Sequence, residues 1–282
     1  TISHLGLITV LIGIGTPMAI VAAIFHILNH AVFKASLFMA VGIIDHECGT
    51  RDMRQLRGLR HSLPITATLA IVASAAMAGV PLLNGFLSKE MFFAETALVG
   101  GDTDWSMSVA ALAMGIFGVA YSLRFISVFF GAPAQNLPKE PHEPPHWMRL
   151  PVELLVFTCL VVGVVPGLSI EPLLNLAVVA TLGDAAPTYD LALWHGFNLP
   201  LVMSVAALCG GVLLYVVLRR HFNLQQREHV PLIYRFNGAQ AYESVMLQMT
   251  RGADRLLRYV GTERLQAQLL LMMLGLLVVP LW

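Results

Sequence analysis

Apolar segments of nearly bilayer length constrain this chain more than any other feature. A membrane-spanning helix needs about 20 predominantly apolar residues. Of the 282 residues, 57% are hydrophobic and only 12% are charged, whereas water-soluble domains carry about 25% charged residues. The sequence therefore predicts an all-α integral membrane protein with about seven membrane segments. These segments are Ile2–Gly13, Pro17–Ile44, Leu63–Leu98, Trp105–Gly131, Leu150–Leu168, Leu199–Leu218 and Leu265–Trp282.

The third segment is too long for one straight spanning helix, and the first is too short to span. The 36 residues of Leu63–Leu98 would extend about 54 Å at helical rise. Their middle reads AGVPLLNGF, with Gly79, Pro81 and Gly85. An interruption at membrane depth is tolerated only where protein or water satisfies the freed backbone groups, and such broken helices mark ion sites in transporters. We therefore predict one broken helix, interrupted around these three residues.

Positive charge alternates between the loops. The loops at 45–61, 132–149 and 219–264 contain lysine or arginine, with eight arginines in the last one. The loops at 99–104 and 169–198 contain acidic residues and no lysine or arginine. Lysine and arginine concentrate in cytoplasmic loops. The pattern therefore predicts that the three loops with lysine or arginine, at 45–61, 132–149 and 219–264, lie in the cytoplasm.

Residues 237–262 have a different pattern from the spanning segments. Apolar residues recur there at about 3.5-residue spacing, and charged residues occupy the other faces. This spacing is typical of an amphipathic helix that lies along a membrane interface. We predict a short lateral helix on the cytoplasmic side, followed by a last membrane helix within 263–282.

The second segment carries three titratable residues at steps of four. His26, His30 and Lys34 fall on one face of a helix, one turn above another. A charged lysine at the bilayer centre costs roughly 2.5–3.5 kcal/mol on insertion scales. Burial disfavours its charged form, and histidine exchanges protons near neutral pH. The spacing therefore favours a proton relay, against the alternative of backbone-bonded histidines and a lysine that extends to the interface.

Further titratable residues follow the break and precede the column. Lys89 follows the interruption in GFLSKEMFF, where the positive end of the second half-helix would face the break. The alternative is an interfacial pair with Glu90. Glu95 is a candidate for an outer aqueous exit, and His4 is a candidate for the same polar axis as the column.

Several classes of function are disfavoured by the sequence. The formal net charge is zero, so nothing indicates nucleic acid. The three cysteines are scattered, which argues against a disulfide framework or a zinc site. The HxxxH pair at 26–30 lacks the glutamate and third ligand of a zinc protease. We therefore expect no metal, no cofactor and no enzymatic active site.

The chain resembles the antiporter-like subunits shared by respiratory complex I, membrane-bound hydrogenases and the Mrp (multiple resistance and pH) cation/proton antiporters. The stretches that carry the resemblance are TISHLGLI (1–8), HILNHAVFKASLFMAVGIIDHECGTRD (26–52) and MAGVPLLNGFLSKE (77–90). Within this superfamily the chain is most similar to the A-type Mrp subunits, through IIDHECGTRD (43–52) and LWHGFNLPL (193–201). A lateral helix of about 39 Å agrees with that subfamily, because the complex I relative has a much longer one.

The resemblance implies a specific organisation. Residues 1–168 would form the second inverted repeat and the end of the antiporter core, incomplete at the N-terminus. Residues 169–236 would add a membrane helix with flanking loops, 237–262 the lateral helix and 263–282 the last membrane helix. His26, His30 and Lys34 would match the central proton relay, and Lys89 the lysine that leads to the outer half-channel. The glutamate–lysine pair of the first repeat is not in this chain, so this piece alone should not transport.

The expected function is that of a subunit in a hetero-oligomeric antiporter of the bacterial inner (plasma) membrane. It would exchange Na⁺ or another monovalent cation for protons, with the other subunits and the lipid bilayer as partners. Two alternatives remain open from the sequence. The chain could be a proton-pumping subunit of complex I or a membrane-bound hydrogenase, or it could be a non-transporting assembly scaffold.

Overall fold

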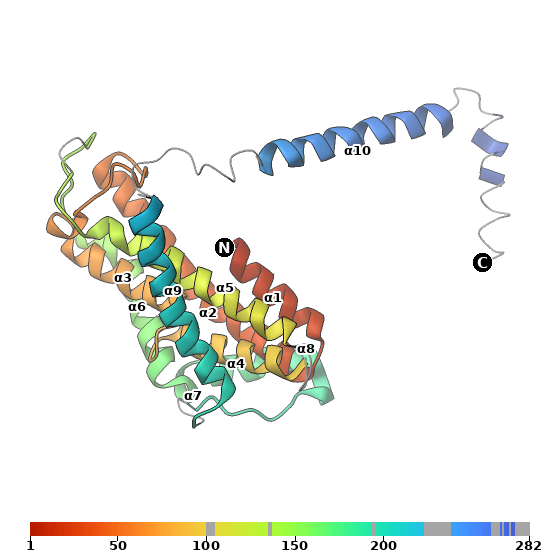
Figure 1. Ribbon diagram of the computed structural model, residues 1–282. Helices are drawn as coiled ribbons and strands as arrows, with labels where there is room; N and C mark the ends of the chain where they lie inside the picture. The colour runs from red at the N-terminus through yellow and green to blue at the C-terminus, as the bar shows by residue number, and fades with distance from the viewer. Residues whose placement is uncertain are drawn as a thin grey trace. The chain divides into compact units, whose positions relative to one another are not determined.

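The computed structural model describes residues 1–99, 105–134, 137–192, 196–222, 238–260, 266, 268–270 and 272–273. These residues form helices and connecting turns, and no β-strand occurs among them. The chain divides into two units, Thr1–Gln226 and Arg227–Trp282. The first unit is a bundle that contains α1 to α9, and the second contains α10 (Figure 1). The prediction of an all-α protein is confirmed.

Helix α2 (Pro17–Cys48) is the centre of the first unit. It begins where Thr16 accepts a hydrogen bond from the backbone N–H of Ala19 through its side-chain oxygen at 3.1 Å, with Pro17 in the first turn. It ends at Gly49, whose left-handed backbone (φ 70°) closes the last turn. Its 32 residues extend about 48 Å, enough to cross a bilayer. Helices that pack against it are α1 (Ile2–Ile14), α3 (Pro64–Ala78), α4 (Asn84–Val99), α6 (His146–Val164) and α8 (Glu171–Leu182).

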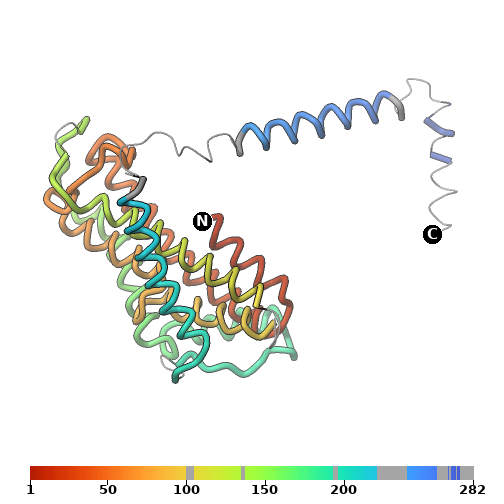
Figure 2. Tube along the Cα trace, viewed as in Figure 1, coloured from red at the N-terminus to blue at the C-terminus, as the bar shows by residue number. Residues whose placement is uncertain are grey.

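The long third segment forms two helices, α3 and α4, as the prediction of a broken helix required. Figure 2 traces the chain from one helix to the other. Gly79 ends α3 in a left-handed conformation (φ 86°) and its N–H bonds to the carbonyls of Ala75 and Ala76 at 3.1 Å. Pro81 lies in the interruption, and Leu82 has a positive φ of 66°. Gly85 differs from the expectation because it lies inside the first turn of α4. A Cβ there would be 1.9 Å from the carbonyl oxygen of Ala76, so Gly85 allows the two half-helices to approach closely.

The remaining helices complete the bundle around this core. Helix α5 (Ser106–Ile126) packs against α3 and α4, and α9 (Leu199–Phe222) lies along α5 and α4 (Figure 1). Gly211 of α9 permits that contact, since a Cβ there would be 2.4 Å from Cβ of Val119. A short helix, α7 (Pro166–Ser169), links α6 to α8, and the described residues also contain 3₁₀ turns at Leu59–His61, Ser127–Phe129 and Gly183–Ala185.

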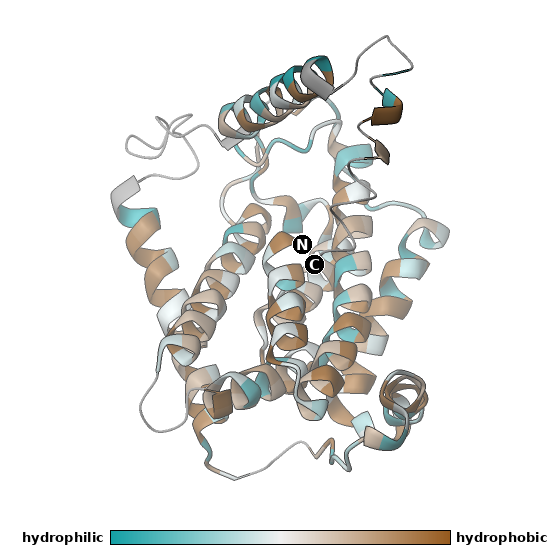
Figure 3. Cartoon of the chain, turned by 90° about the vertical axis from the view of Figure 1, so that its right-hand side faces the viewer, coloured by the Kyte–Doolittle hydropathy of each residue, from teal (hydrophilic) through white to brown (hydrophobic). Residues whose placement is uncertain are grey.

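Four stretches of the described chain are long and apolar enough to cross a membrane. Large apolar side chains are exposed on every one of these helices, as expected for surfaces that meet lipid. Examples are Phe38, Phe117, Phe157 and Leu213. Figure 3 shows hydrophobic residues along the bundle helices. The four stretches are Pro17–Cys48, Ser106–Phe129, His146–Val164 and Leu199–Arg220.

One expectation for the first unit is wrong, and one for the second is confirmed in part. The stretch 169–198, for which the sequence predicts a loop, contains the 12-residue helix α8, which packs on α2. At this length α8 is too short to span a bilayer, so the length criterion for spanning segments does not detect it.

In the second unit, α10 (Gly238–Val260) is a helix as predicted, and its recurring apolar residues, including Tyr242, Met249 and Leu256, are exposed. The last expected segment lies mostly outside the described residues.

The N-terminus of α3 is fixed by a carboxylate from the loop at 132–149. Glu143 accepts hydrogen bonds from the hydroxyl of Thr66 at 2.6 Å and from the N–H groups of Thr66 and Ile65 at 3.0 and 3.2 Å. A negative charge at a helix N-terminus is stabilising. We expect Glu143→Ala to destabilise the protein by about 1 kcal/mol, measured as a lower midpoint temperature of unfolding in detergent. Glu140→Ala, an exposed change in the same loop, should have little effect; equal effects would contradict the capping role.

Candidate functional site

Three histidine rings from two helices meet in the interior of the first unit. His4 of α1 packs beside both histidines of α2, with ring centroids 5.2 Å from His26 and 5.3 Å from His30. The His26 and His30 rings are 6.2 Å apart, as one helical turn requires. Phe33 packs against all three rings, with centroids at 5.4–6.3 Å. The spacing on α2 thus brings two of the predicted residues together, and α1 adds His4.

Hydrogen bonds extend this cluster across four helices. Nδ1 of His4 lies 3.0 Å from Nε2 of His26, and Nε2 of His4 lies 2.9 Å from the hydroxyl of Tyr121 on α5. Nδ1 of His26 lies 3.0 Å from Oγ of Ser88 on α4. Ser88 in turn donates to the carbonyl of Gly85 at 3.4 Å. His26 is fully buried and His4 nearly so.

The third member of the predicted column has different surroundings. Lys34 is half-buried, and its ammonium lies 6.0 Å from the ring centroid of Phe38. It is one turn beyond His30 on α2. The column therefore runs from a closed interior at His26 to a more accessible position at Lys34.

Lys89 occupies the interruption between the two half-helices. Its ammonium donates to the carbonyls of Met77 and Ala78 at 2.8 and 2.9 Å, which are the last carbonyls of α3. The side chain is only 4% exposed. Its stem passes Gly79, where a Cβ would be 2.9 Å from Cδ of the lysine. Lys89 is thus bound to the negative end of α3, in a buried position unlike that of an interfacial pair.

Buried polar atoms beside the cluster lack protein partners. Among the described residues, Nε2 of His30, Nδ2 of Asn29 and Oδ1 of Asn84 make no hydrogen bond. Asn84 lies at the start of α4, and its Nδ2 donates to the carbonyl of Asn29 at 3.4 Å. Buried polar groups in proteins are almost always bonded to protein or to ordered water. We therefore expect water beside His30 and the break.

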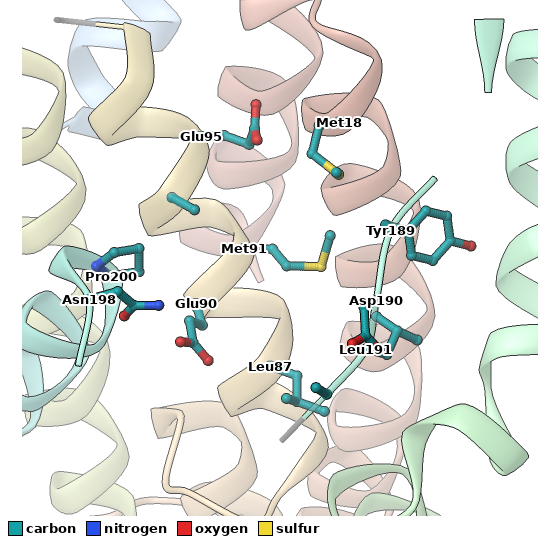
Figure 4. A pocket seen from close by; sticks show the side chains of 12 residues that line it. Met18, Leu87, Glu90, Met91, Glu95, Tyr189, Asp190, Leu191, Asn198 and Pro200 are labelled. Atoms are coloured by element: carbon teal, nitrogen blue, oxygen red, sulfur yellow. The ribbon is translucent and has the colours of Figure 1, made fainter. Parts of the chain in front are cut away.

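A cavity of about 370 Å³ lies on another face of α4. Figure 4 shows the side chains around it, which include Glu90 and Glu95 of α4, Met18 of α2, Tyr189, Asp190, Leu191, Asn198 and Pro200. Glu95 is only 5% exposed and accepts a hydrogen bond from the hydroxyl of Thr16 at 2.8 Å. The cavity also contains Asp190 in its lining. Glu95 therefore lines an acidic cavity at the far end of the helix that carries Lys89.

Several site residues were missed by sequence reasoning. Tyr121, Ser88, Asn29 and Asn84 are ordinary polar residues in apolar segments, and their partners are distant along the chain. The one available signal was a tyrosine hydroxyl within a span, a group that usually has a hydrogen-bond partner when buried. In the described part of the chain, no three His, Cys, Asp or Glu side chains are arranged to hold a metal ion.

Comparison with known proteins relates this chain to a family. Residues 1–117 match the family described as NADH:quinone oxidoreductase/Mrp antiporter, transmembrane. A relative from Rhizobium meliloti (strain 1021), named as the A/B subunit of a probable K(+)/H(+) antiporter, is 56% identical over 277 residues, which are 96% of this chain and 28% of the relative. The A subunit of a Na(+)/H(+) antiporter from Alkalihalophilus pseudofirmus is 35% identical over 83% of this chain and 33% of its own length.

A solved structure of a related protein has a similar fold. One protein in the structure of the Mrp complex from Dietzia sp. DQ12-45-1b superposes with a TM-score of 0.72 at 33% identity. The superposition covers 98% of this chain and 29% of that protein, so this chain spans about a third of such proteins. It is a multi-pass membrane protein. This chain belongs to the NADH:quinone oxidoreductase/Mrp antiporter family and is homologous to part of the A-type antiporter proteins.

Proposed function

We propose that this chain is part of a subunit of a multi-subunit monovalent cation/proton antiporter in the bacterial inner membrane. Protons would pass through the buried groups His26, His30, Lys34 and Lys89, with His4 as a member of the same path. Glu95 would lie at the outer exit, in the acidic cavity beside α4. The proton gradient would drive cation exchange without a redox cofactor.

One observation carries the proposal. His4 and His26 are buried and hydrogen-bonded to each other, next to a lysine held by the last carbonyls of a broken helix. Each neutral imidazole has one nitrogen that accepts a proton and another that releases one. Bulky apolar groups would pack such an interior more simply, and buried ionisable groups in membrane proteins are costly. A run of these groups across helices is typical of a proton path.

The proposed topology follows the positive residues. The loops at 45–61 and 132–149 would face the cytoplasm, and the cavity beside Glu95 would face outward. The parts would be 1–168 for the antiporter core, 169–236 for an added membrane helix, 237–262 for a lateral helix and 263–282 for a last membrane helix. Further helices and partner subunits would complete the path, because the relatives are about three times longer.

We propose sodium or potassium, among the monovalent cations, as the exchanged ion. One relative is named for K(+)/H(+) antiport and another for Na(+)/H(+) antiport, with the higher identity to the former. The buried groups described above handle protons and do not distinguish the two ions. The experiment must therefore offer both.

A second function is favoured by the breadth of the family description, which includes NADH:quinone oxidoreductases. In that case the same groups would move protons, driven by electron transfer in a partner. A scaffold role is the third candidate, in which the complete complex would assemble around this chain without using its histidines.

The test uses everted membrane vesicles that contain the whole complex, with a pH-sensitive dye and a gradient built by respiration. We expect sodium or potassium to collapse the gradient, and we expect Lys34→Ala to reduce that response by about tenfold or more. Arg124→Ala is the matched control, because Arg124 is an exposed cation on α5.

Each result has a distinct meaning. A gradient that no cation affects, but that a redox substrate builds through the complex, would overturn antiport in favour of the respiratory alternative. A wild-type response in Lys34→Ala would instead remove this column from the path and favour the scaffold.

A further inference from the structure

We infer that Tyr121 is a proton-relay residue that connects Lys89 to the histidine cluster through His4. This inference rests on the proposed function and deepens it. Tyr121 projects from α5, a helix to which no relay residue was assigned, and its hydroxyl lies 2.9 Å from Nε2 of His4. It is the group at the α5 end of the hydrogen-bonded run that continues through His4 and His26 to Ser88.

The donors and acceptors along these hydrogen bonds can be assigned by starting from Ser88. If Ser88 donates its hydroxyl proton to the carbonyl of Gly85 at 3.4 Å, its oxygen accepts from Nδ1–H of His26 at 3.0 Å. With its proton on Nδ1, neutral His26 accepts at Nε2, and the donor in this arrangement is Nδ1–H of His4. Neutral His4 is then an acceptor at Nε2, which a hydroxyl donor from Tyr121 satisfies. One set of tautomers thus fits all four bonds, with Tyr121 as the first donor.

Gly118 of α5 lies close to both Lys89 and Tyr121. A Cβ built on Gly118 would be 3.7 Å from Nζ of Lys89 and 3.9 Å from the hydroxyl of Tyr121. Because Gly118 has no side chain, no atom of residue 118 occupies the place near both the Lys89 ammonium and the Tyr121 hydroxyl. The two distances place Nζ of Lys89 and the hydroxyl of Tyr121 less than about 8 Å apart, a separation that one or two bridging waters can cover. The geometry gives Lys89 a route to the histidines that does not run along α2.

The transfer balances as a shift of one proton. Lys89, as an ammonium, gives a proton to the Tyr121 oxygen through water, while the Tyr121 hydroxyl gives its own proton to Nε2 of His4. His4 releases its Nδ1 proton to Nε2 of His26. The products are a neutral lysine amine, an intact tyrosine, the other tautomer of His4 and an imidazolium at His26, and no electrons move. Tyr121→Phe would keep the ring and break the first step.

The first test removes that one oxygen from the complete complex. We expect Tyr121→Phe to lower the maximal rate of cation-dependent proton exchange at least about tenfold, with the KM for the cation unchanged and the complex assembled. Tyr215→Phe, the same chemical change on α9 beside another cavity, should keep wild-type exchange. A wild-type rate in Tyr121→Phe would overturn the inference while leaving the antiport function intact.

The second test closes the space without removing a polar group. Gly118→Ala should be tolerated, because its Cβ would make ordinary contacts at 3.7 and 3.9 Å. Gly118→Val should fill the space between Lys89 and Tyr121 and reduce exchange about as much as Tyr121→Phe does. Full exchange by an assembled Gly118→Val complex would contradict a route through this space.

A spectroscopic test does not require transport, so it separates this inference from the proposed function. In pH-difference infrared spectra of the purified complex, protonation of the histidines should shift the C–O stretch of one tyrosine. That band should disappear in Tyr121→Phe and persist in Tyr215→Phe. Its persistence in Tyr121→Phe would exclude Tyr121 as the coupled group, even if the vesicles had shown no cation response.

Discussion

Replacing Lys89 by arginine is expected to stop proton exchange while the complex still assembles. Arginine retains the positive charge and the donors toward the carbonyls of Met77 and Ala78, but it does not release a proton at physiological pH. If Lys89 carries protons, the exchange rate should fall by about 100-fold or more. The measurement is dye-monitored exchange in everted vesicles, combined with the amount of intact complex extracted from the membrane.

Two other variants define the meaning of that result. Lys89→Ala should also lose most exchange, because it removes both the carrier and the two hydrogen bonds at the end of α3. Lys139→Arg, at an exposed lysine that donates to the carbonyl of His46 at 3.0 Å, should behave as wild type. Substantial exchange by Lys89→Arg would show that the charge is needed at this position and that its titration is not.

The sequence predicted the parts of this site that lie on single helices. Spacing of four placed His26 and His30 on one face of α2, and the glycines and proline after Ala78 indicated a break before Lys89. These are local properties, set by helical pitch and by backbone freedom. The predictions of roles for these residues remain predictions.

The contacts between helices could not be predicted in the same way. His4 meets His26 across 22 residues of sequence, Ser88 meets His26 across 62, and Tyr121 meets His4 across 117. Such pairs depend on which faces of α1, α4 and α5 turn inward, and apolar segments with lipid on one side and protein on the other carry little periodic signal for that choice. The short helix α8 was missed for a related reason, since 12 mostly apolar residues fit either a loop or a helix.

Gly85 shows how a residue can be recognised for the wrong reason. Its position near Pro81 suggested that it interrupts the helix, yet it lies within α4. What the fold requires is its missing side chain, because the carbonyl of Ala76 occupies the place where a Cβ would be. Glycine supplies close approach here and conformational freedom at Gly79, and a sequence alone does not separate the two uses.

Gly85→Ala is expected to be the most destabilising single-methyl change in this interior. The Cβ would be 1.9 Å from the oxygen and 2.9 Å from the carbon of the Ala76 carbonyl, and backbone atoms at a helix end cannot move aside as a side-chain tip can. Overpacking of interiors costs about 1–3 kcal/mol and occasionally more, so we expect at least about 2 kcal/mol. The loss of stability should be measured as a smaller amount of assembled complex and a lower midpoint temperature of disassembly in detergent.

The matched control is Gly42→Ala on α2, a helical and exposed glycine with nothing within 4 Å of the added Cβ. There alanine should be neutral or stabilising by up to about 1 kcal/mol, because it is the better helix former. If Gly85→Ala assembled as well as Gly42→Ala, the close approach of α3 and α4 would not be required. Because Gly85 is one turn before Lys89 and its carbonyl accepts from Ser88, forcing the half-helices apart should also displace both ends of the relay. Stability and exchange should therefore fall together in Gly85→Ala, whereas Lys89→Arg should lose exchange alone.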